Sequence, residues 1–69
     1  MVEVFRTNIE DEIVANAVAR ELGSLFPGAL INFDLDDCDR ILRVAGAGIV
    51  PRTITEFLAR KGHQCEILE

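Results

Sequence analysis

The stretch LINFDLDDCDRILRV, residues 30–44, decides the fold of this chain because it predicts a β-hairpin. Ile31, Phe33 and Leu35 are spaced two residues apart, so they share one face of a first strand. Residues 36–39 predict a turn, since aspartate tolerates turn conformations and hydrogen-bonds its own backbone. The apolar residues that follow this turn predict a returning strand.

Upstream of the hairpin, the sequence predicts a strand followed by an amphipathic helix. Residues 2–7 are rich in β-branched and aromatic side chains, which favour a strand. Asn8 is the expected N-cap of the helix, and residues 10–12 place three carboxylates in its first turn, where they face the positive end of the helix dipole. Pro27 and Gly28 are expected to end it. Its predicted apolar face consists of Ile13, Val14, Ala17, Val18, Leu22, Leu25 and Phe26.

Downstream of the hairpin, residues 46–48 predict a flexible break because two of the three are glycine. Pro51 suits the first turn of a second helix, and Lys61 and Gly62 are typical of its end. Residues 64–68 predict the last strand. The inward side chains expected on the second helix are Ile54, Phe57 and Leu58.

The order of these elements is βαββαβ, which predicts an α+β, ferredoxin-like domain over residues 1–69. Right-handed crossovers place both helices on one face of a four-stranded antiparallel sheet with strand order 4-1-3-2. An unrelated α+β meander is the alternative. The predicted topology brings three junctions to one edge of the sheet: residues 7–12, 36–39 and 62–65.

Four side chains that can bind metals are therefore expected at one end of the molecule: Asp11, Cys38, His63 and Cys65. Cys38 lies in the hairpin that joins the second and third strands, and Cys65 lies in the fourth; the third and fourth strands flank the first, about 10 Å apart. A disulfide needs Cα atoms within about 7 Å, so both cysteines are expected to be free thiols.

The composition excludes several classes of protein. A net charge of −5, from 12 acidic and 7 basic residues, argues against binding to nucleic acid or to an anionic membrane surface. The same excess is compatible with a basic partner or a cation. The chain has neither a run of about 18 apolar residues nor a signal peptide, so a cytoplasmic protein is expected.

The spacing of apolar residues and turn glycines resembles that of heavy-metal-associated domains, the family that includes copper chaperones. This family has the topology predicted above and carries a Cys-x-x-Cys metal site where the first strand meets the first helix. The matching stretches are residues 5–9, Val18 with Leu22, residues 33–35, residues 41–44 and residues 61–63.

The sequence departs from this family at the metal site. Aligning the first helix on its apolar residues places the family's two cysteines at Asp11 and Val14, whereas a shorter loop places them at Ile9 and Glu12. Neither pair contains the thiolates that Cu(I) requires, so the site is expected to be degenerate and to hold no cofactor. His63 stands where a residue of the family modulates the metal site.

Two functions remain open, and neither is enzymatic, because the single histidine has no evident serine partner and the nearby Cys65 has no evident third group to orient it. The first is a protein-interaction module that docks a protein, or a second copy of itself, through the exposed sheet face or the edge strand at residues 30–35. The second is a metal-binding protein that holds a transition metal ion at a rearranged site built from Asp11, Cys38, His63 and Cys65. If Cys65 faces the helices, it belongs to the core and the second function fails.

The aspartates around Cys38 allow two interpretations. They raise the pKa expected of a neighbouring thiol and so disfavour a redox role. The cluster is a solvated hairpin tip or, alternatively, a weak site for a hard cation; it lacks the spacing of an EF-hand.

Overall fold

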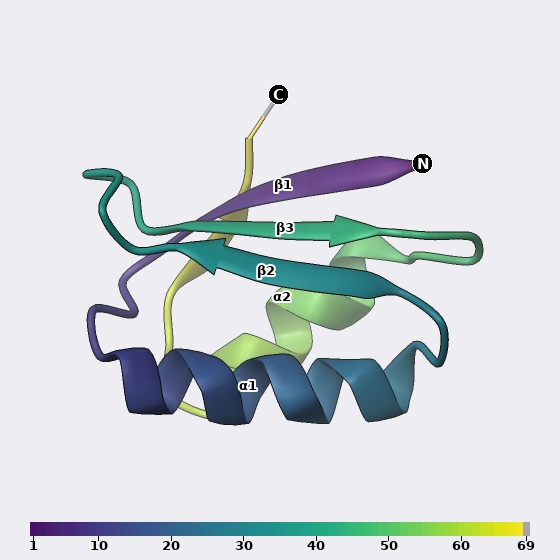
Figure 1. The fold of residues 1–69 in the computed structure, drawn as a ribbon, viewed down its shortest axis with the longest axis horizontal. Helices are drawn as coiled ribbons and strands as arrows, with labels where there is room; N and C mark the ends of the chain where they lie inside the picture. Colours follow the sequence, from purple (N-terminus) through teal and green to yellow (C-terminus); the bar gives the residue numbers. More distant parts are fainter. Residues whose placement is uncertain (69) are drawn as a thin grey trace.

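The computed structural model describes residues 1–68, and its elements follow the predicted βαββαβ order (Figure 1). The antiparallel sheet has the order β2-β3-β1-β4, which is the ferredoxin-like arrangement expected from the sequence. The elements are β1 (Val2–Thr7), α1 (Glu12–Leu25), β2 (Leu30–Asp34), β3 (Ile41–Ala45), α2 (Pro51–Arg60) and β4 (Cys65–Ile67). No helix within residues 1–68 is both long and apolar enough to cross a membrane.

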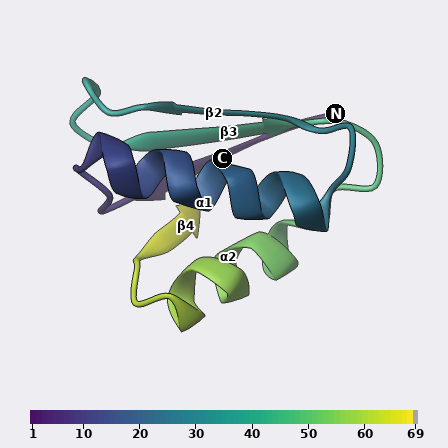
Figure 2. The ribbon, with the colours of Figure 1, turned by 60° about the horizontal axis from the view of Figure 1, so that its bottom comes forward.

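Both helices lie on the same side of the sheet, and the core fills the space between the two layers (Figures 1 and 2). Helix α1 packs against β2, and α2 packs against β4. Phe5 of β1 lies opposite Leu42 of β3, and both side chains are fully buried. The other fully buried large side chains are Leu22, Val44, Ile54 and Leu58.

Helix α1 begins three residues later than the sequence predicts. Its N-cap is Asp11, whose Oδ1 accepts hydrogen bonds from the backbone N–H groups of Ile13 at 2.7 Å and Val14 at 3.4 Å. The prediction that Asn8 caps the helix is wrong: Asn8 Oδ1 accepts instead from the backbone N–H of Gln64. The physical reason is Ile9, which is 3% exposed and draws the chain into the core before the helix begins.

The buried face of α1 is narrower than predicted. Ala15, Val18 and Leu22 are buried because they face the sheet. The sheet covers only one side of the helix, so apolar residues to either side of that face remain in solvent. Three residues were wrongly expected to point inward: Ile13, Ala17 and Leu25.

The ends of α2 match the prediction. Pro51 is its first residue, and its C-terminus closes with a Schellman motif after Lys61. Gly62 has a φ of 88° and donates its N–H to the carbonyl of Ala59, while the N–H of His63 donates to the carbonyl of Leu58. A left-handed residue is required at this position, and glycine adopts that conformation without steric cost.

We expect Asp11→Ala to lower the free energy of unfolding by about 1 kcal/mol, because it removes the side-chain acceptor of the α1 N-terminus. Glu10→Ala is the matched control: the Glu10 side chain is 75% exposed, and its loss removes only a surface ion pair with Arg40. Urea unfolding followed by circular dichroism measures both. Equal losses in the two variants would contradict the assignment of Asp11 as the cap.

Candidate functional site

The three junctions predicted to meet at one edge of the sheet do meet there. At the end of β1, the N–H of Thr7 donates to the carbonyls of Asp39 at 3.1 Å and Arg40 at 3.2 Å in the hairpin. One residue later, Asn8 Oδ1 accepts from Gln64 N at 2.9 Å in the turn before β4. The loop after β1 is therefore held between the hairpin turn and the turn before β4.

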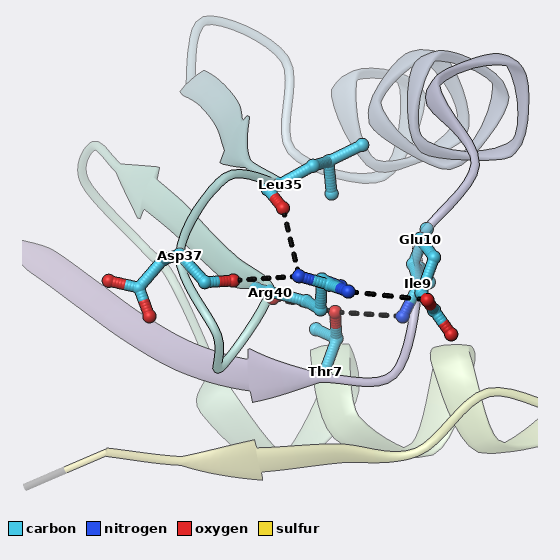
Figure 3. Close-up of polar contacts among 6 residues, drawn as sticks. All are labelled: Thr7, Ile9, Glu10, Leu35, Asp37 and Arg40. Atoms are coloured by element: carbon cyan, nitrogen blue, oxygen red, sulfur yellow. Dashed lines mark hydrogen bonds and ion pairs between the residues drawn. The ribbon is translucent and has the colours of Figure 1, made fainter.

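Arg40 organises the hairpin turn (Figure 3). It is the one non-glycine residue with a positive φ among residues 1–68, at 47°. Its Nη1 donates to the carbonyls of Leu35 and Asp37, both at 3.1 Å, and its Nη2 pairs with Glu10 Oε1 at 3.2 Å. A single guanidinium group therefore ties the turn to itself and to the loop before α1.

The Thr7 hydroxyl group completes this contact. It donates to the Arg40 carbonyl at 2.7 Å and accepts from the N–H of Ile9 at 3.2 Å. Thr7 is 6% exposed, so water cannot replace either bond. We call Thr7, Leu35, Asp37 and Arg40 the hairpin clasp.

Three of the four candidate metal ligands have structural roles at this edge. Cys65 lies opposite Thr7 and packs against the core, on the helix side of the sheet. Burial raises the pKa of the Cys65 thiol to about 11, and the negative charge of Glu66 adds to the effect. Asp11 caps α1, and the backbone of His63 closes α2. Cys65 therefore faces the helices and belongs to the core, which is the condition set out above against the metal-binding function.

The fourth candidate, Cys38, lies at the exposed hairpin tip. Within residues 1–68, one group of three side chains brings possible ligand atoms within 4.8 Å of one another, and it consists of Asp37, Cys38 and Asp39. This group contains none of the other three candidates. Asp37 Oδ1 already accepts from the N–H of Asp39, and Asp39 Oδ1 pairs with Arg6 at 3.3 Å. Both carboxylates therefore serve the turn itself.

The positions that align with the family's cysteines are occupied by structural side chains under either alignment. Asp11 caps the helix and Val14 packs against the core. In the alternative alignment, Ile9 is buried and Glu12 lies in the first turn of α1. Both cysteines of the chain are free, as expected.

Sequence analysis did not anticipate a groove between α1 and β2, with a volume of about 580 Å³. Its helix wall is formed by Glu12, Ala15, Asn16 and Ala19, whose spacing of i, i+3, i+4 and i+7 places them on one side of α1. This spacing was the available signal, and the two alanines explain the free space. The other lining residues are Ile31, Asn32, Phe33, Asp34, Leu35, Asp36 and Arg43. We call this feature the α1–β2 groove.

The strand that borders this groove is an edge of the sheet. The N–H of Thr7 donates to the Arg40 carbonyl and that of Gly46 to the Met1 carbonyl, so even-numbered residues of β3 face β1. Odd-numbered residues of β3 therefore bond to their register partners in β2, which are even-numbered. The backbone N–H and C=O groups of Ile31 and Phe33 consequently point away from the sheet.

No protein-family model, no curated protein and no solved structure matches this chain.

We expect Thr7→Val to lower the free energy of unfolding by about 1–3 kcal/mol, because it leaves the buried N–H of Ile9 without an acceptor. Thr7→Ser keeps the hydroxyl group and is the control. Chemical denaturation measures both, and a Thr7→Ser variant that is less stable than Thr7→Val would contradict the role of the hydroxyl group.

The two thiols should differ in reactivity. At pH 8, iodoacetamide should modify Cys38 at least about tenfold faster than Cys65, because Cys65 is partly buried with a pKa of about 11. Peptide mapping by mass spectrometry gives the two modification rates, and the unfolded protein in urea, where the two rates should be equal, is the reference. Equal rates in the native protein would contradict the burial of Cys65.

Ionisation of Cys65 favours the unfolded chain, whose thiol has a pKa of 9.0, so the free energy of unfolding should fall as the pH rises from 9.0 to about 11.

Proposed function

We propose that this chain is a non-catalytic protein-interaction domain that binds an extended segment of its partner by strand addition to β2. The observation that carries the proposal is the free edge of β2 beside the α1–β2 groove. In strand addition, main-chain hydrogen bonds supply affinity and pockets for alternate side chains supply specificity. The outward backbone groups of Ile31 and Phe33 can form these main-chain hydrogen bonds, and the groove can hold the alternate side chains.

The other edge of the sheet suits this role less well. Strand β4 spans three residues, whereas β2 spans five. Short edge strands are one of the devices by which proteins avoid pairing with other chains. Beside β2, by contrast, Ile31 and Phe33 are only partly buried and line the α1–β2 groove.

The resemblance to heavy-metal-associated domains supports a domain that has lost the metal site of that family and has kept a surface for binding a protein partner. The metal-binding alternative, a transition metal ion held by Asp11, Cys38, His63 and Cys65, has less support. Cys65 belongs to the core, and the group around Cys38 combines one soft thiol with two carboxylates already engaged in the turn.

Selection from a display library of random peptides against the immobilised domain tests the proposal without a known partner. Selected peptides should shift the backbone amide resonances of residues 31–34. They should also slow hydrogen exchange at Ile31 and Phe33, whose N–H groups gain acceptors in the added strand. Peptides that shift only β4 or the open sheet face would contradict strand addition at β2. Sedimentation of the domain alone at increasing concentration shows whether it self-associates, which is the expected result if a second copy supplies the added strand.

A pair of substitutions on α1 gives a sharper test. Ala19→Gln places a longer side chain in the groove and should weaken binding of selected peptides at least about tenfold, since bound side chains lose space. Ala17→Gln makes the same change on the exposed side of the helix and should alter affinity less than about twofold. Isothermal titration measures both. A similar loss in both variants would point to a general effect on α1.

A further inference from the structure

We propose that the partner segment is an extended basic peptide in which lysine or arginine alternates with apolar residues, bound in the α1–β2 groove. This inference rests on the proposed function and adds the chemistry of the partner.

The charges that line the groove are the first part of the argument. Glu12, Asp34 and Asp36 contribute three carboxylates, and Arg43 contributes the one basic side chain. Glu12 begins α1, and Asp34 and Asp36 lie where β2 enters the hairpin, so all three belong to the end of the groove next to the hairpin clasp. A basic segment meets a favourable potential there, on a domain whose net charge is −5.

These carboxylates are also free to accept a partner. Within the described residues, none of the three forms an ion pair. Their acidic neighbours Glu10 and Asp39 are paired with arginines of the same domain. With three carboxylates against the single guanidinium group of Arg43, the groove keeps a net negative charge.

The two sides of an added strand account for the alternation. Ile31 and Phe33 pack toward the core, so Asn32 and Asp34 face the opposite, open side of the sheet. Alternate side chains of an added strand would do the same. Those on the helix side meet the partly exposed Ala19, whose small side chain leaves room for apolar groups, and those on the open side meet Asp34.

The polarity of the groove agrees with this pattern. Beyond the groove, at the start of β2, Leu30 is 76% exposed on the open side of the sheet, next to Ala45 and Val2 in the register of the sheet. An apolar side chain is therefore favoured at that end and a basic one near Asp34.

Three capped octapeptides test the partner class on the intact domain: alternating valine and lysine, alternating valine and serine, and alternating valine and glutamate. The lysine peptide should bind at least about tenfold more tightly than the glutamate peptide and shift the amides of residues 31–34. Its affinity should fall as salt rises from 50 to 500 mM, because ions screen the exposed carboxylates.

Single substitutions assign the charge. Asp34→Asn and Asp36→Asn should each weaken the lysine peptide at least about threefold and leave the serine peptide unchanged. Glu66→Gln removes an exposed carboxylate from β4, on the other edge of the sheet, and should change affinity less than about twofold. The amide spectrum of each free variant reports whether the fold is intact.

Each outcome decides the inference. Preference for the lysine peptide, with loss in both aspartate variants, supports it. Equal binding of the three peptides, tighter binding of the glutamate peptide, or no binding of the lysine peptide overturns it. The proposed function fails separately, only if display-selected peptides of any charge also leave the amides of β2 unshifted.

Discussion

Where β1 ends, the Thr7 hydroxyl group donates to the carbonyl of Arg40, and the Arg40 guanidinium group donates back into its own turn at Leu35 and Asp37. The left-handed backbone of Arg40 is held in place by these bonds. The same contact holds Leu35 and Asp36 at the end of the groove and, through Ile9, holds the loop that leads into α1. The core, the start of the helix and the groove therefore depend on the hairpin clasp, in which Thr7 is the buried member.

Helix α1 has two neighbouring faces with different roles: one packs against the sheet, and the other lines the α1–β2 groove. Val18 and Leu22 close the core against the sheet. The adjacent face presents Ala19 and Asn16 to the edge of β2, and their small or polar side chains leave the strand uncovered. A helix with large apolar residues on both faces would cover this edge, which is a common protection against unwanted pairing. The open edge is thus a property of the α1 sequence as well as of the sheet.

The edge of the sheet where the sequence places candidate metal ligands carries side chains with structural roles. Asp11 caps the helix, Ile9 fills the core, and Cys65 packs against the helices. A metal site that used Asp11 and Cys65 would have to give up a cap and a core contact. A surface for a protein partner, by contrast, requires no change in the packing of this domain.

The amino-acid sequence determined the order of elements, the hairpin, the ends of α2 and the edge at which three junctions meet, because turn residues and apolar periodicity are local signals. It also shows that the chain has no Cys-x-x-Cys pair. Only the tertiary structure decided that Asp11 rather than Asn8 caps α1, because burial of Ile9 depends on the distant strands. It alone decided which apolar residues of α1 remain in solvent and that a groove lies beside β2. Both follow from how α1 packs against β2, which no local pattern specifies.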